Sequence, residues 1–202
     1  MKSSIFFVLA SFFYIDRLKV SLLSSIFLLL SPYGIGQTTN DESDRLLAIQ
    51  DSIFRSLTGK VFPLDSLNII DGKKLISNDL IGKPTLINFW FTTCKPCIDE
   101  MPVLNEIKRS YINRINFIAV TYEDKAKVNN FLHKYKFDFT QVVNAQKYID
   151  NIGFISFPVN IILDKNRIVV SIQNGIPYIS NEKGELKIGE GHELRDILEK
   201  LL

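Results

Sequence analysis

Two cysteines, Cys94 and Cys97, are the residues of this sequence whose type and spacing are best suited to chemistry. They are the only cysteines among its 202 residues. An apolar run, residues 86–91, precedes them, and from Ile98 onward apolar residues recur every three positions. This change of pattern predicts a buried strand that leads into a helix, with the cysteines at the first turn of that helix.

The start of a helix is a favourable place for a reactive thiol. A free thiol has a pKa of about 8.5, and only the thiolate is nucleophilic. Unpaired N–H groups and the helix dipole favour that anion, and Lys95 adds a positive charge. Pro96 fits the first turn because its missing N–H costs nothing there. We therefore predict Cys94 as the exposed attacking thiol and Cys97, one turn along, as the covered thiol that resolves the mixed disulfide.

Three other interpretations of the pair are weaker. A structural disulfide closing so short a loop would contribute only about 2 kcal/mol in the chain-entropy model. A zinc site would need further ligands, but there is no second cysteine pair, and His133 and His192 lie far along the chain. Two core cysteines that meet by chance would not explain their position between a strand and a helix. Redox chemistry is the favoured interpretation.

The residues around the pair resemble the thioredoxin superfamily and, within it, the ResA/TlpA-like extracytoplasmic thiol-disulfide oxidoreductases. The resemblance covers about residues 59–202 and is carried by Asn88-Phe89-Trp90, Cys94-Lys95-Pro96-Cys97, Glu100, Pro102 and Phe157-Pro158. It implies an α/β thioredoxin-like fold, with a mixed central sheet flanked by helices and an N-terminal β-hairpin extension. It also implies a cis proline at Pro158 facing the cysteines, and no cofactor beyond a redox-active Cys94–Cys97 disulfide.

The resemblance also assigns a role to Glu100. Thioredoxin has a buried aspartate where this chain has Asn88, and in the ResA-like branch a glutamate three residues after the second cysteine takes over its proton transfer. Glu100 lies one turn beyond Cys97, and burial would raise its pKa. The alternative is a solvated acid that stabilises the helix N-terminus, as we expect for Asp99. One departure from the branch is Thr93, where a tryptophan is usual.

Substrate contacts are expected from residues that flank or face the cysteines. We predict that Trp90, Lys95, Pro96, Phe157 and Pro158 form this surface. A cis bond at Pro158 would turn backbone groups of Phe157 toward the cysteines. An extended substrate would then add to them as a strand through two hydrogen bonds.

The remaining elements follow from hydrophobic period and turn residues. The expected elements are a hairpin around Asp71-Gly72, a parallel strand at 115–121, a helix at 125–135, a strand at 141–144, a helical turn at 146–152, a hairpin at 159–172, a loop or small hairpin at 174–191 and a helix at 192–202. Residues 122–124 are expected as a solvated loop that caps the next helix. In the segment before the domain, an apolar stripe from Leu46 to Leu57 predicts another helix.

The first 36 residues do not have the pattern of a folded domain. Neither of their two apolar runs reaches the 18 or so residues that a spanning helix needs. The second run follows basic residues and precedes small ones, which is typical of a signal peptide cleaved near Gln37. An uncleaved membrane anchor is the alternative. We predict a leader at 1–36, a helix or linker at 37–58, a domain at 59–202 and a periplasmic or cell-envelope location.

These observations predict a thiol-disulfide oxidoreductase that reduces disulfides in envelope proteins, apocytochrome c among the candidates. A membrane thiol donor protein would return its cysteine pair to the reduced form. We expect the protein to be a monomer. The net charge of +2 without a basic stripe does not favour nucleic-acid binding. One alternative is a copper chaperone that holds metal between the cysteines. Another is a peroxidase, which needs threonine three residues before its cysteine, where this chain has Phe91.

Overall fold

The computed structural model describes residues 38–181 and 183–202, so the predicted leader lies outside the described residues. Residues 46–202 form one compact unit, and the residues up to Arg45 belong to a separate one. Within the described part of the chain, no helix is both long enough and apolar enough to cross a membrane.

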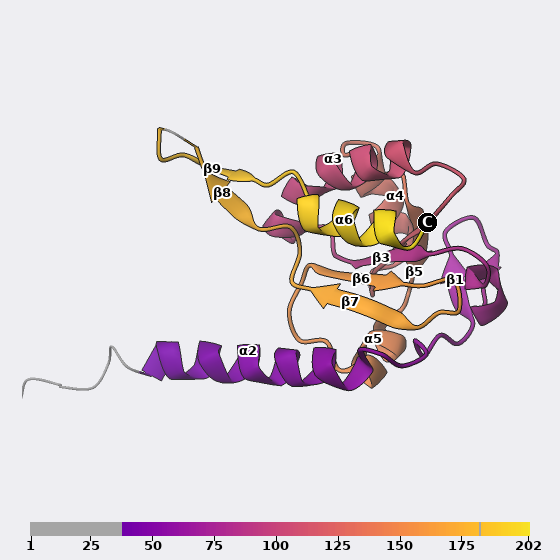
Figure 1. The fold of residues 1–202 in the computed structure, drawn as a ribbon, viewed down its shortest axis with the longest axis horizontal. Coiled ribbons are helices and arrows are strands. Elements are labelled where there is room, and N and C mark those ends of the chain that lie inside the picture. The colour runs from indigo at the N-terminus through magenta and orange to yellow at the C-terminus, as the bar shows by residue number, and fades with distance from the viewer. Residues whose placement is uncertain (1–37, 182) are drawn as a thin grey trace, which may run out of the picture. The chain divides into compact units, whose positions relative to one another are not determined.

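A seven-stranded mixed sheet forms the centre of the domain (Figure 1). Its strands are β1 (Leu67–Ile69), β2 (Lys74–Leu75), β3 (Thr85–Phe89), β4 (Asn116–Val120), β5 (Thr140–Val143), β6 (Val159–Leu163) and β7 (Val169–Gln173). They lie in the order β2-β1-β5-β4-β3-β6-β7. β3 is parallel to β4 and antiparallel to β6, and all five of its residues are buried. The strand that precedes the cysteines is therefore held on both edges.

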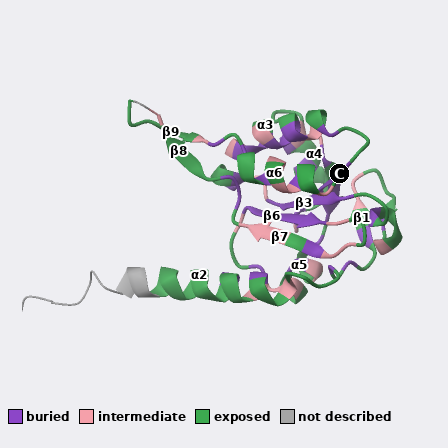
Figure 2. Ribbon diagram, viewed as in Figure 1, coloured by how far each residue is buried: buried purple, intermediate pink, exposed green. Residues whose placement is uncertain are grey.

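Helices cover both faces of the sheet. On one face lie α3 (Lys95–Ser110), α4 (Lys125–Leu132) and α6 (His192–Lys200), which share a core with Leu86 of β3. On the other face α5 (Gln146–Ile152) and Phe54 of α2 (Thr38–Leu57) pack with Ile87 of β3. This alternation of side chains is what a strand requires. The arrangement confirms the expected thioredoxin-like α/β fold, and Figure 2 shows the strands β3 and β6 as buried.

The predicted hairpins are present. β1 and β2 pair antiparallel across the Asp71-Gly72 turn, as do β6 and β7 across their own turn. A single turn of 3₁₀-helix, Ser77–Leu80, leads toward β3. The segment at 174–191 contains a small antiparallel hairpin of β8 (Tyr178–Ser180) and β9 (Leu186–Ile188), one of the two forms expected for it.

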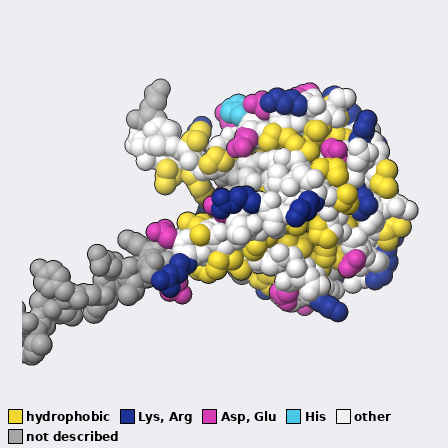
Figure 3. All heavy atoms as spheres, turned by 60° about the horizontal axis from the view of Figure 1, so that its bottom comes forward, with side chains coloured by type: hydrophobic (Ala, Val, Ile, Leu, Met, Phe, Trp, Pro, Cys, Tyr) yellow, Lys and Arg dark blue, Asp and Glu magenta, His cyan; other side chains and the backbone are white. Residues whose placement is uncertain are grey.

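Charged side chains are spread over the surface. On the face in Figure 3, basic and acidic side chains are interspersed rather than gathered in one patch. Large exposed apolar side chains also come from several elements, and they include Leu47, Ile81, Ile112 and Leu186.

The apolar stripe predicted for α2 is wrong in its first half. Leu46 and Ile49 are 48% and 50% exposed, whereas the buried positions of this helix are Gln50 and Phe54. The Gln50 side chain bridges the loop before β6: its Oε1 accepts from the Ile155 N–H at 3.1 Å, and its Nε2 donates to the Ser156 carbonyl at 3.3 Å. A polar residue with paired donor and acceptor groups therefore occupies the face that the pattern assigned to leucine and isoleucine.

We expect Gln50→Ala to lower the free energy of unfolding by about 1–3 kcal/mol, because the buried Gln50 side chain and its hydrogen bonds to the Ile155 N–H and the Ser156 carbonyl would be lost. Urea denaturation followed by circular dichroism measures this change. Leu47→Ala on the same helix is the control, since Leu47 is 53% exposed, and we expect it to change stability by less than about 0.5 kcal/mol. Equal effects from the two variants would contradict this account of α2.

Candidate active site

The chain between β3 and α3 forms a tight turn that delivers Cys94. Trp90 continues the strand by donating its N–H to the Val120 carbonyl at 3.1 Å. The Cys94 N–H then donates to the Phe91 carbonyl, also at 3.1 Å, and closes the turn. Cys94 is the N-cap residue of α3, and Pro96 lies in the first turn, as predicted.

The cysteine sulfurs lie at the opening of the helix. The Cys94 Sγ accepts a hydrogen bond from the Cys97 N–H at 3.2 Å, and the two residues are joined by a disulfide. Cys94 is only 5% exposed and Cys97 is fully buried. The predicted order of exposure is correct, but the expectation of an openly exposed Cys94 is not, because the surrounding turn covers most of it in the disulfide form.

Lys95 pairs with an acid one turn along the helix. Its Nζ lies 2.5 Å from Asp99 Oδ2, and the Tyr178 hydroxyl of β8 donates to the same oxygen at 2.6 Å. The hydrogen bond from Lys95, followed by that from Tyr178, lowers the pKa of Asp99. Asp99 in turn raises the pKa of Tyr178 to about 12. The charge of Lys95 is therefore shared with Asp99, and the β8–β9 hairpin is tied to the first turns of α3.

Glu100 is fully buried, which rules out the alternative of a solvated acid. Its Oε1 accepts from Asn88 Nδ2 at 2.7 Å, and its Oε2 accepts from Asn160 Nδ2 at 3.1 Å and from the Ile176 N–H at 2.8 Å. Asn88 and Asn160 are directly paired across β3 and β6. Burial raises the pKa of Glu100 to about 7, although these hydrogen bonds oppose the rise. The carboxyl can therefore gain or lose a proton near neutral pH.

Pro158 and Gly175 pack against this carboxyl. The Phe157–Pro158 peptide bond is cis, as the resemblance implied, and Pro158 is buried. Gly175 has a φ of +72°, and a Cβ on it would lie 2.5 Å from Pro158 Cγ and 3.1 Å from Glu100 Oε2. Sequence reasoning missed Gly175, whose only signal was its place in a glycine-rich segment.

The substrate-contact predictions divide into two groups. Lys95 and Pro96 are exposed, and the ring of Phe157 is half-buried against Phe91 at 5.6 Å between centroids. Trp90 is a correction: it is fully buried, and its ring packs on Phe131 with centroids 5.0 Å apart. Strand alternation directs its side chain into the core beneath α4 rather than toward a substrate.

The expectation that residues 122–124 form a solvated loop is wrong for Glu123. Its neighbour Asp124 caps α4 as expected, by accepting from the Lys127 N–H at 2.8 Å. Glu123, however, is only 4% exposed and accepts two hydrogen bonds from Thr92, at 2.7 Å from the N–H and 2.9 Å from the hydroxyl. Its position just past a buried parallel strand was the available signal.

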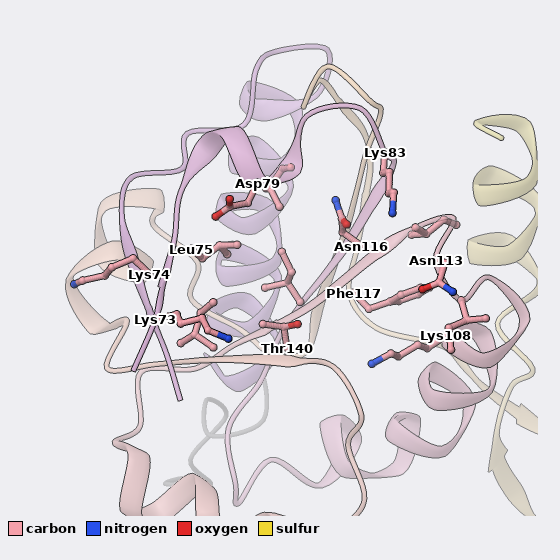
Figure 4. A pocket seen from close by; sticks show the side chains of 15 residues that line it. Lys73, Lys74, Leu75, Asp79, Lys83, Lys108, Asn113, Asn116, Phe117 and Thr140 are labelled. Atoms are coloured by element: carbon pink, nitrogen blue, oxygen red, sulfur yellow. The ribbon is translucent and has the colours of Figure 1, made fainter. Parts of the chain in front are cut away.

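A separate cavity of about 520 Å³ lies at the end of the sheet where strands β4 and β5 begin (Figure 4). Lysines line it, but Lys73 pairs with Asp71 at 3.0 Å, and the Nζ of Lys108 donates to the Asp138 carbonyl. Cys94 follows the opposite ends of the parallel strands. Among the residues that the structure describes, no group of three or more His, Cys, Asp or Glu could hold a metal ion.

The geometry is that of a thioredoxin-like redox site, and comparison with known proteins agrees. Residues 58–172 match the AhpC/TSA family. The chain belongs to the AhpC/TSA family. This match and the ResA relative described next together confirm the predicted thioredoxin-superfamily and ResA-like assignment.

Two curated relatives support the assignment. The chain is 30% identical over 121 residues to the thioredoxin-like protein YneN of Bacillus subtilis, across 58% of this chain and 71% of YneN. It is 35% identical over 115 residues to the thiol-disulfide oxidoreductase ResA of Bacillus thuringiensis, across 55% of this chain and 66% of ResA. The predicted enzyme class, thiol-disulfide oxidoreductase, is confirmed by such relatives.

Solved structures show the same fold. The thioredoxin domain of a thiol-disulfide oxidoreductase from Bacteroides vulgatus superposes with a TM-score of 0.56 at 23% identity, across 71% of this chain and 96% of that one. A secreted disulfide oxidoreductase of Mycobacterium tuberculosis gives 0.53 at 19% identity, across 68% and 96%.

We expect Glu100→Gln to remove a specific pH dependence of stability. The folded protein holds this proton with a pKa of about 7, against 4.5 for an unperturbed glutamate, so wild-type stability should fall as the pH rises through that window. The full effect is about 3 kcal/mol by linkage. Urea denaturation at several values between pH 4.5 and pH 8 measures the decline, and any constant offset caused by the amide does not depend on pH.

Asp99→Asn is the matched control for this measurement. The pKa of Asp99 is lowered from 3.8, so its contribution is constant above pH 5. If Glu100→Gln shows the same pH profile as wild type, Glu100 does not titrate in this range.

We expect Gly175→Ala to destabilise the protein far more than Gly184→Ala. Both residues have positive φ, +72° and +78°, which costs a residue with a Cβ about 1–2 kcal/mol. Only at Gly175 would the new methyl group also meet Pro158 and Glu100, at a further cost of about 1–3 kcal/mol, since nothing lies within 4 Å at Gly184. Equal losses of unfolding free energy would contradict the close packing described here.

Proposed function

We propose that this chain reduces disulfide bonds in proteins of the cell envelope, with Cys94 as the nucleophile and Cys97 as the resolving thiol. The observation that carries the proposal is the position of the Cys94 Sγ as the acceptor at the N-cap of α3, 3.2 Å from the Cys97 N–H. In the reduced protein the same N–H and the helix dipole favour the thiolate over the thiol.

The exchange proceeds through one mixed disulfide. The Cys94 thiolate attacks a sulfur of the substrate disulfide, forms a new S–S bond and releases the first substrate thiolate. The Cys97 thiolate then attacks the Cys94 Sγ, releases the second substrate thiolate and forms the disulfide seen in the structure. The substrate gains two electrons and takes up protons, and the cysteine pair loses two electrons. A thiol donor protein at the membrane would return the pair to its reduced form.

Glu100 serves as the proton acceptor for Cys97. It is the acid one turn further along the same face of α3, and its pKa of about 7 matches an acid–base group that works near neutral pH. Transfer of the Cys97 proton to the carboxylate would produce the resolving thiolate when the mixed disulfide has formed. The two asparagines on β3 and β6 hold the carboxyl in place.

An envelope location is part of the proposal. The signal-peptide pattern in residues 1–36 supports export, with an uncleaved anchor as the alternative form. The domain limits at 37–58 and 59–202 also remain predictions. In an oxidising compartment both cysteines would tend to form the disulfide, so their reduction requires the membrane donor. The exchange itself uses residues of one chain only, which is consistent with a monomer.

We expect the reduced protein to reduce insulin disulfides with dithiothreitol as electron source, and Cys94→Ser to abolish this activity. Cys97→Ser should instead accumulate a mixed disulfide with the substrate, which mass spectrometry detects under non-reducing conditions. Cys94→Ser is the control for trapping. If neither Cys97→Ser nor Cys94→Ser forms a mixed disulfide with the substrate, the assignment of Cys94 as nucleophile is wrong.

The same preparations test the alternatives. Stoichiometric binding of Cu(I) by the reduced protein, without reductase activity, would favour the copper chaperone. Consumption of peroxide that exceeds disulfide reduction would favour the peroxidase, for which Phe91 lacks the required hydroxyl. Trapping by Cys97→Ser in a periplasmic extract, followed by mass spectrometry, would identify the natural target and test the cytochrome c hypothesis.

A further inference from the structure

We propose that Glu123 is a positioning residue for Cys94: its buried carboxylate holds the turn that places the Cys94 sulfur at the helix N-terminus. This inference rests on the proposed function, because it concerns the reactivity of the proposed nucleophile. Glu123 lies beyond β4, 29 positions after Cys94 in the sequence, and has no part in the thiol exchange itself.

The turn before Cys94 connects β3 to α3. It begins as β3 ends, and the bond from the Cys94 N–H to the Phe91 carbonyl closes it. Between them lie Thr92, which is half-buried, and Thr93, which is exposed. The ring of Phe91 packs on Tyr122 and Phe157, and the hydrogen bonds of Thr92 provide the polar attachment of the turn.

Glu123, in the loop that follows β4, accepts those hydrogen bonds. Its Oε2 accepts the Thr92 backbone N–H at 2.7 Å, and its Oε1 accepts the Thr92 hydroxyl at 2.9 Å. Both distances are those of charge-assisted hydrogen bonds. Glu123 is itself fixed, since its backbone carbonyl accepts from the Asn144 N–H at 2.9 Å. A two-point attachment of this kind restrains both the position and the rotation of the turn two residues before Cys94.

The Glu123 carboxylate could also act on Cys94 through its charge. Loss of this charge and loss of the attachment to Thr92 would change the pKa of Cys94 in opposite directions. A negative charge near the sulfur would disfavour the thiolate, so its removal would lower the pKa of Cys94. Loss of the attachment would loosen the N-cap geometry and raise that pKa. Lys127 lies 2.7 Å from Glu123 Oε1 and offsets its charge. We therefore expect the positional effect to dominate.

The test measures the pKa of Cys94 in the full chain carrying Cys97→Ser, where only one thiol reacts. The rate of alkylation by iodoacetamide is followed against pH, so no substrate is needed. Adding Glu123→Ala should raise the Cys94 pKa by about one unit, which is about a tenfold loss of thiolate below that pKa. Glu123→Gln should restore the rate to within about twofold of the parent, because an amide can still pair with the Thr92 N–H and hydroxyl.

Asp124→Ala is the matched control. It removes the N-cap hydrogen bond of α4 in the same loop without touching Thr92, so it should lower the melting temperature and leave the Cys94 pKa unchanged. A lowered or unchanged pKa in Glu123→Ala would overturn the proposal, as would an equal rise in Asp124→Ala. If Glu123→Ala does not fold, Thr92→Val replaces it in the test, since this variant loses the hydroxyl contact with Glu123 and keeps the N–H contact. A Cys94 pKa in Thr92→Val that does not rise above the value in Asp124→Ala would overturn the proposal.

The outcome is separable from that of the proposed function. If the wild-type protein reduces no disulfide but Glu123→Ala still raises the Cys94 pKa, the positioning role holds and the proposed activity fails. If the wild-type protein reduces insulin and the pKa does not move, the activity holds and the role of Glu123 fails.

Discussion

The hydrogen bond from the Cys97 N–H to the Cys94 sulfur is the interaction on which this site depends. It requires a helix that begins at Cys94 and a strand that ends shortly before it. β3 meets the second requirement because parallel β4 and antiparallel β6 hold it on either edge. The proline in the first turn of α3 meets the first, since it lacks an N–H that would otherwise need a partner. The sheet and the helix therefore act together to present one sulfur.

A second group of interactions holds the titratable carboxyl of Glu100 inside the core. Fully burying a carboxyl group is costly unless its oxygens have partners. Here the partners come from three separate segments: Asn88 on β3, Asn160 on β6 and the Ile176 N–H beyond β7. These three donors are neutral, so they stabilise the carboxylate without pinning it in the charged form. Burial and hydrogen bonding thus oppose each other and leave the group near its point of half-titration.

Much of the fold could be predicted from the sequence, because alternation and helical period record which faces are buried. The strand-to-helix passage at Cys94 and the hairpin at Asp71-Gly72 are local patterns of this kind. The buried roles of Gln50 and Glu123 could not be predicted in this way, since each depends on a partner far along the chain, at Ile155 and Thr92. Trp90 shows the converse: its place in the motif suggested contact with a substrate, but strand alternation turns it inward.

The segment that follows β7 has a consequence for how this protein can vary. Ile176 contributes its amide to the buried carboxyl and Tyr178 its hydroxyl to Asp99, so the first residues of the excursion belong structurally to the redox centre. At the far end of the hairpin, Asn181 and Glu185 bond to each other, and Leu186 is 73% exposed. Insertions, deletions or exchanged sequences should therefore disturb the redox centre less at the tip of the hairpin than at its base.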